Sequence, residues 1–302
     1  AFSPATQKAW MLLLEGPYRQ GTNGTEKSSI VAARPALDVK KSGPNAGLEI
    51  PYDPALIIRA QSLLLEDADK LSASRPYRFD LVDVQRQMMT NLGQLIHRKA
   101  AEAFRSKDRE AFTLHSGRFL GMLADMDTLL RTRSEYSFDR WLTEARSWGE
   151  TEEEKNQMER DATSLVTIWG ADGDPRIFDY SWREWAGLIN GYYLPRWQKF
   201  YTMLQQHLDE GTSYEEAGLP QIYGREAFRA NDFYHTLAEW ELSYVDTYGK
   251  ARIPATEGDE VDIVKRLFKK YFKLSQEYYT DSIKLIKPSR DERTYENLGE
   301  DL

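Results

Sequence analysis

The sequence contains no cysteine, and no uninterrupted apolar stretch approaches the length that a lipid bilayer requires. The first absence excludes disulfide bonds, thiolate nucleophiles and zinc sites built on thiolates. The second predicts that no helix spans a membrane, because such a helix needs about 20 consecutive, mainly apolar residues. Enzyme classes that depend on cysteine chemistry are therefore excluded.

An excess of positive charge is also missing. The 302 residues include 40 Lys and Arg against 48 Asp and Glu, which gives a formal net charge of -8. The basic residues are spread along the chain rather than clustered, so nucleic acid is not an expected partner. With 41% hydrophobic and 29% charged residues, the composition is typical of a globular protein with one large domain or two smaller ones.

Signatures of metal and cofactor chemistry are absent as well. The four histidines do not show the spacing of a zinc-binding helix and are expected to pack in the core or lie at the surface: His97, His115, His207 and His235. No glycine-rich phosphate loop or nucleophile elbow occurs, and we expect no cofactor. The acidic stretches LLLEDADKL and ETEEEKNQMERD lie at expected helix ends, where a solvated acidic face is the ordinary interpretation.

Apolar residues recur every three or four positions over long stretches, and alternating β-branched runs are nearly missing. This pattern predicts an all-α fold class, an irregular multi-helix bundle with long ordered loops. Capping residues, prolines and glycines delimit the expected helices. They cover residues 3–15, 53–72, 79–104, 108–130, a short segment from 137, 151–169, 181–208, 225–248 and 259–287.

The domain organisation follows from these helices. We expect an N-terminal helix and a long loop in residues 1–52, a helical domain in 53–287 and a flexible tail in 288–302. The first helix has Ser3 as its cap and Pro4 at its first position. Because the chain begins directly at this helix, we expect further chain before it.

Aromatic residues gather in and beside the expected helix 181–208, which Gly191 and Pro195 should kink. Most of these rings should be buried, as is usual for large aromatics at helical spacing. Trp169 and Tyr180 differ, because they bracket the irregular stretch WGADGDPRIFDY, where a ring can stay exposed and contact a sugar. A structural and a ligand-binding role both remain open for these two residues.

The segment DYSWREWAGLINGYYLPRWQKFY, residues 179–201, resembles a helix of the family 89 α-N-acetylglucosaminidases. That helix reads approximately DY, then LAGL, then a tyrosine pair and PRW. The similarity continues in the same order through AWMLLLEGPY, ARPAL, YRFDLVDVQRQ, LVTIWG and VDIVKRLFKKYF, up to about residue 275. The matching part of the family is its C-terminal all-helical region.

The resemblance implies hydrolysis of terminal, non-reducing α-linked N-acetylglucosamine with retention of configuration. In the family two glutamates on an N-terminal (β/α)8 barrel perform the chemistry, so this chain should hold no catalytic residue. The helical region closes one side of the pocket, and residues 1–52 should pack toward the barrel. The implied partners are the carbohydrate substrate and the barrel domain of the same protein. The alternative is a non-catalytic helical carbohydrate-binding or scaffold module.

Three site residues follow from the resemblance by alignment. Trp169 matches the tryptophan of a TLWG-like stretch, and Tyr180 matches the tyrosine of the DY helix, so both should face the substrate. Glu26 stands where the animal enzymes have a histidine; alone it would be interpreted as a solvated loop carboxylate. The loop at residues 172–177 is longer than in the animal enzymes and lacks their cysteines. These differences suggest a bacterial member, which the family would place in the periplasm or outside the cell.

Overall fold

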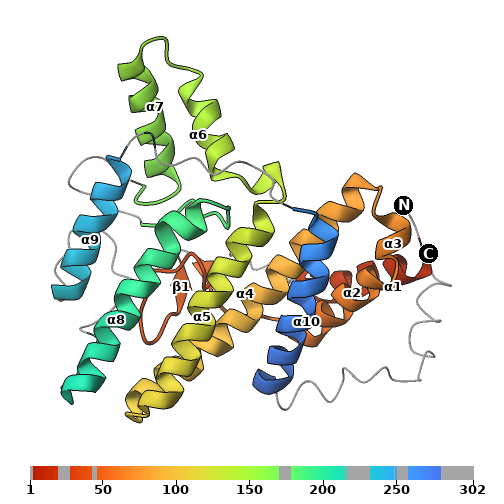
Figure 1. The fold of residues 1–302 in the computed structure, drawn as a ribbon, viewed down its shortest axis with the longest axis horizontal. Coiled ribbons are helices and arrows are strands. Elements are labelled where there is room, and N and C mark those ends of the chain that lie inside the picture. Colours follow the sequence, from red (N-terminus) through yellow and green to blue (C-terminus); the bar gives the residue numbers. More distant parts are fainter. Residues whose placement is uncertain are drawn as a thin grey trace.

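The computed structural model describes residues 3–19, 28–42, 46–169, 178–214, 216, 232–247, 249 and 258–279. Within these residues the regular structure is almost entirely helical (Figure 1). The exception is a pair of two-residue antiparallel strands, β1 (Lys41–Ser42) and β2 (Ala46–Gly47). The predicted all-α fold class is confirmed.

The α-helices are α1 (Pro4–Glu15), α2 (Pro54–Glu66), α3 (Ala68–Leu71), α4 (Arg75–Arg105), α5 (Arg109–Leu130), α6 (Phe138–Arg146), α7 (Glu152–Leu165), α8 (Leu194–Glu210), α9 (Asp232–Val245) and α10 (Glu260–Tyr278). Shorter turns are η1 (Pro17–Arg19), η2 (Ser134–Tyr136) and the π-helical η3 (Ile189–Tyr193). None of the helices in the described part of the chain is long and apolar enough to cross a bilayer.

Most helices begin and end where their capping residues predict. The Ser3 hydroxyl accepts a hydrogen bond from the Thr6 N–H at 3.0 Å, and Thr151 forms a capping box with Glu154. Asp108 caps α5, and Gly211 ends α8 in the left-handed region at φ 70°. These ends are set by bonds within one turn of helix, so the sequence predicts them directly.

The helices lie side by side in the order α9, α8, α5, α4 and α10 (Figure 1), while α2 packs against α4 and α1 packs against α2. A short turn between α4 and α5 makes these two helices antiparallel. Helices α6 and α7 form a hairpin above this row. The candidate site lies just after the end of α7, beside α8 and α9.

One hydrophobic core runs through the row of helices and extends from Ala9 in α1 to Tyr279 after α10. Residues 30–33, which precede α2, are almost completely buried in this core. Residues on both sides of position 52 therefore share one core. The packing of residues 1–52 against a barrel stays a prediction, and the expected tail at 288–302 lies outside the described residues.

The predicted helix 181–208 is wrong in its first part, because residues 181–186 are not helical. Ala186 instead bridges the segment before α6: its N–H donates to the Tyr136 carbonyl at 2.8 Å, and its carbonyl accepts from the Phe138 N–H at 3.1 Å. Gly187 then adopts a φ of 86°. At Gly191, where the sequence predicts a kink, the chain forms the π-helical turn η3, which leads directly into α8.

The predicted helix 53–72 is interrupted at Asp67, where α2 has ended and α3 begins. The Asp67 carboxylate accepts a hydrogen bond from the Ser3 hydroxyl at 2.5 Å and pairs with Lys70 at 3.0 Å. These contacts join the break to the start of α1. Helix α4 begins at Arg75, about one turn before the predicted start.

Candidate functional site

Trp169 and Tyr180, the two aromatic residues that the sequence singled out, lie ring against ring. Trp169 follows the end of α7, and Tyr180 lies beyond residues 170–177, which fall outside the described residues. Their ring centroids are 4.7 Å apart at an interplanar angle of 56°. Tyr180 is 44% exposed and Trp169 is partly exposed. The pair therefore presents aromatic surface to solvent at a single place.

The backbone beside both rings is held in an unusual conformation. Helix α7 ends at Leu165, before the predicted end at Trp169. Trp169 and Asp179 have φ values of 42° and 57°, a region that costs a non-glycine residue about 1–2 kcal/mol. The Trp169 N–H donates to the Ser164 carbonyl at 2.8 Å, and the Asp179 N–H donates to the Thr167 carbonyl at 2.6 Å. These bonds hold in place the two arms of the loop, which are residues 164–169 and 178–180.

A small apolar cluster anchors the same two arms. Ile168 precedes Trp169, Phe178 precedes Asp179, and both side chains are buried. They pack with Ala238 and with one further buried residue of α9, Val245, in a cluster separate from the main core. Ile168 and Phe178 therefore attach the segments that carry the aromatic pair to α9.

Four buried charged residues, named here the ion cluster, lie next to this segment: Arg34, Asp179, Arg196 and Glu241. Nη1 of Arg196 lies 2.9 Å from Oδ2 of Asp179 and 2.9 Å from Oε1 of Glu241. Arg34 binds the Glu241 carboxylate through two nitrogens, at 2.7 and 3.2 Å. The two positive and two negative charges of the cluster therefore balance.

Aromatic rings surround the two guanidinium groups of the ion cluster. The Arg34 guanidinium lies 4.2 Å from the centroid of the Phe178 ring. The Arg196 guanidinium lies 4.5 Å from the Tyr192 ring and 5.1 Å from the Tyr193 ring. Burial raises the pKa of Asp179 to about 6, although the charge of Arg196 opposes this shift.

Sequence reasoning did not identify the ion cluster. Arg34 belongs to ARPAL, Arg196 to PRW and Asp179 to DY, so all three lie in motifs that carry the family resemblance. Their charge pattern gave no sign of pairing, because Arg34 and Glu241 are 207 positions apart. Only the packing of α8 and α9 against residues 28–37 brings them together.

Glu184, a further buried carboxylate, fixes the segment that follows residues 20–27. It accepts hydrogen bonds from the Ser29 hydroxyl at 2.5 Å and the Thr90 hydroxyl at 2.7 Å, and it pairs with Arg86 of α4. Glu26 lies within residues 20–27, outside the described residues. Its hydrogen bond to a sugar therefore stays a prediction.

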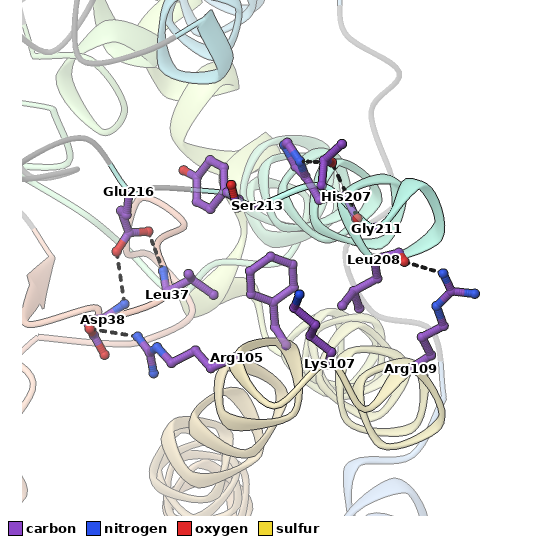
Figure 2. A pocket seen from close by; sticks show the side chains of 13 residues that line it. Leu37, Asp38, Arg105, Lys107, Arg109, His207, Leu208, Gly211, Ser213 and Glu216 are labelled. Carbon is purple, nitrogen blue, oxygen red and sulfur yellow. Dashed lines mark hydrogen bonds and ion pairs between the residues drawn. The ribbon is translucent and has the colours of Figure 1, made fainter.

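A cavity of about 560 Å³ opens elsewhere, between the C-terminal ends of α4 and α8 (Figure 2). Its charged groups mostly bind protein: Arg105 pairs with Asp38 at 2.7 Å, and Glu216 accepts from the Leu37 N–H at 2.6 Å. Arg109 donates to the carbonyl of Leu208. Neither Trp169 nor Tyr180 lines this cavity, so it is separate from the aromatic pair.

The buried carboxylates near the pair are bound to arginines rather than available to a substrate. Asp179 pairs with Arg196, Glu241 with Arg34 and Glu184 with Arg86. In the parts of the chain that the structure describes, no group of three or more histidine, aspartate or glutamate residues could hold a metal ion. The partly exposed aromatic pair is therefore the group of this segment that could contact a ligand.

Comparisons with known proteins agree with the fold and with the motifs. Residues 1–270 match the family model described as the α-N-acetylglucosaminidase (NAGLU) C-terminal domain. The α-N-acetylglucosaminidase of Homo sapiens is 30% identical over 275 residues, which are 89% of this chain and 33% of the human protein.

Two solved structures of a family 89 glycoside hydrolase from Clostridium perfringens are similar to this chain at 25% identity. One is a complex with 2-acetamido-1,2-dideoxynojirmycin, with a TM-score of 0.77 over 89% of this chain. The other, a complex with the substrate GlcNAc-α-1,4-galactose, has a TM-score of 0.78 over 91% of this chain. The match covers 30% of each solved chain, so this chain spans about a third of the length of its relatives. The resemblance seen in residues 179–201 is confirmed, and the chain belongs to the family of α-N-acetylglucosaminidase C-terminal domains.

Proposed function

We propose that this chain forms one wall of the sugar-binding pocket in an α-N-acetylglucosaminidase. Trp169 and Tyr180 would contact the terminal α-linked N-acetylglucosamine. The observation that supports this role is the partly exposed aromatic pair, whose ring centroids lie 4.7 Å apart, beside the buried ion cluster. A solved relative binds GlcNAc-α-1,4-galactose as its substrate, which supports the choice of ligand.

The chemistry of the pair fits a pyranose ring. An aromatic face packs against the C–H groups of the sugar and against the acetamido methyl group, and the Tyr180 hydroxyl can exchange a hydrogen bond with a sugar hydroxyl. Such contacts orient the sugar without taking part in bond cleavage. The chain would thus act through positioning.

Bond cleavage in this proposal belongs to two glutamates outside this chain. One attacks the anomeric carbon to form a covalent glycosyl-enzyme, and the other protonates the leaving oxygen and then activates water. The configuration at the anomeric carbon is retained. The barrel domain that carries these residues would be the partner of the helical wall.

The proposal extends to source and location. We place the protein in a bacterium, in carbohydrate metabolism, and in the periplasm or outside the cell. The support for a bacterial source is the absence of cysteine from the segment between Trp169 and Tyr180, where the animal enzymes have cysteines. The location rests on the family.

Ligand-observed NMR with methyl N-acetyl-α-glucosaminide tests the sugar contact directly. We expect binding with a Kd on the order of 1 mM, the affinity of a single partial wall. Trp169→Ala should abolish the saturation transfer. Trp148→Ala is the matched control, because Trp148 is 83% exposed and pairs with no described ring. Equal binding by the two variants would contradict the proposal.

A chromogenic α-N-acetylglucosaminide tests the division of labour. We expect no hydrolysis by this chain, because the proposal places both catalytic glutamates elsewhere. Hydrolysis that persists through repeated purification would overturn that placement. The carboxylates of this chain would then have to be reconsidered one by one.

A further inference from the structure

We propose that the ion cluster of Arg34, Asp179, Arg196 and Glu241 positions the Trp169–Tyr180 pair for its ligand. All four side chains are at most 5% exposed, so they act through the aromatic pair rather than by touching the sugar. This inference rests on the proposed function, since it names the residues that set the geometry of the same site.

The ion cluster is linked to the aromatic pair through the backbone of the chain. Asp179 immediately precedes Tyr180, and its side chain is held by Arg196 at 2.9 Å. The Asp179 N–H also donates to the carbonyl of Thr167, two residues before Trp169. One residue of the cluster therefore joins the two arms that carry the rings.

The other three members tie this junction to separate parts of the fold. Arg34 belongs to the buried segment before α2, Arg196 to α8 and Glu241 to α9. Nη2 of Arg196 also donates to the Ala32 carbonyl at 2.8 Å. Contacts with three separate elements therefore fix the position of the backbone next to Tyr180.

Stability alone does not explain the choice of charged residues. Desolvating four charges is costly, and apolar residues of similar volume often fill such a space with no loss of stability. Within the described residues, Oδ1 of Asp179, Nη1 of Arg34 and Nε of Arg196 have no hydrogen-bond partner. Charged hydrogen bonds are directional, however, and they fix one arrangement where apolar packing would permit several.

Near-UV circular dichroism gives a readout of the pair itself. The signal of the pair is defined as the near-UV spectrum of the chain minus that of Trp169→Leu. For each variant, it is the spectrum of the variant minus that of the same variant with Trp169→Leu added. Glu241→Gln should remove at least half of this signal while the far-UV spectrum and cooperative unfolding are retained. Arg34→Lys should keep part of the signal, because it retains the charge opposite Glu241 but loses the two-nitrogen contact and the stacking on Phe178, whereas Arg34→Met should lose the signal.

Glu260→Gln is the matched control. Glu260 is a buried carboxylate that pairs with Arg78 and Arg133 at the start of α10, and it contacts no member of the ion cluster. It should leave the signal of the pair unchanged. If Glu241→Gln does not fold, Asp179→Asn, which removes one charge and keeps the side-chain shape, decides the question by the same criterion.

Affinity for methyl N-acetyl-α-glucosaminide is the second readout, and Glu241→Gln should weaken it at least fivefold. An unchanged signal of the pair in a folded Glu241→Gln or Asp179→Asn chain would overturn the inference and assign the positioning to Ile168 and Phe178. A chain that shows the expected dichroism but does not bind the glycoside would instead count against the proposed function alone.

Discussion

Oδ1 of Asp127 in α5 accepts a hydrogen bond from the Gly187 N–H at 2.7 Å, at the point where residues 181–186 give way to helix. The same oxygen accepts from the Asn190 N–H at 3.1 Å, and the other oxygen pairs with Arg131. Gly187 has a φ of 86°, a conformation that favours glycine. One buried carboxylate thus fixes the entry to η3 and α8.

Asp127→Ala should lower the free energy of unfolding by about 2–4 kcal/mol, because it leaves two backbone donors and one arginine without their acceptor. Urea unfolding measures the change. Glu144→Ala is the control: its exposed pair with Arg140, at 2.8 Å, should contribute less than about 0.5 kcal/mol. Similar losses in the two variants would show that the Asp127 contacts are not structural.

His97 should make stability depend on pH. Its Nδ1 lies 2.8 Å from the Tyr201 hydroxyl in the core, and burial lowers the pKa of His97 to about 4. The unfolded chain titrates near the ordinary value of about 6.5, so protonation favours unfolding between these values. The contribution of neutral His97 to stability is present above pH about 6.5 and is lost as the pH falls toward 4.

The stability difference between the chain and His97→Gln should therefore shrink by about 3 kcal/mol from pH 7 to pH 4. Urea unfolding across this range measures it. His235→Gln serves as the control, because His235 lies on the exposed face of α9. A constant difference for His97→Gln would mean that the pKa of His97 is the same in the folded and the unfolded chain.

Two helical glycines should respond to alanine with opposite signs. A Cβ at Gly93 in α4 would lie 2.6 Å from Cε of Met122 and 3.2 Å from Cγ2 of Ile30. At Gly117 in α5 a Cβ would meet nothing within 4 Å. Gly93→Ala should destabilise the chain by about 1 kcal/mol through overpacking, and Gly117→Ala should stabilise it by up to about 1 kcal/mol. Stabilisation by both variants would show that the Met122 side chain moves aside at little cost.

Tyr180 should contribute to sugar binding mainly through its ring. Tyr180→Phe keeps the ring against Trp169 and loses only the hydroxyl, so the affinity for methyl N-acetyl-α-glucosaminide should fall by a factor of about 2–5. Tyr180→Ala should reduce it about tenfold or more. NMR titration measures both. Equal losses in the two variants would assign the contribution to the hydroxyl.

The sequence predicted the features that depend on short stretches of chain. A capping side chain bonds to a backbone N–H within three residues, so its position can be predicted from a short stretch of sequence. Ser3, Asp108 and Thr151 are such caps. The buried tyrosines of η3 and Trp197 followed from helical spacing in the same way. The family was also accessible, since its motifs are contiguous.

Residues 181–186 could not be predicted from such local patterns. Their apolar spacing suits a helix, but the backbone of Ala186 is bound to residues 136 and 138. The pairing competes with helix formation and depends on how α5 and α6 are placed. A contact of this kind leaves no local signal, because its two halves lie about 50 positions apart in the chain.

The sequence by itself therefore determined an all-α chain, most of its helix ends, its family and two aromatic residues at the ends of one loop. Only the tertiary structure brought Trp169 and Tyr180 within 4.7 Å and placed Asp179 on Arg196. The physical reason is the separation along the chain of the residues that interact. Caps and turns are decided by bonds within a few residues, whereas the ion cluster forms only when α8 and α9 pack against residues 28–37 and exclude water.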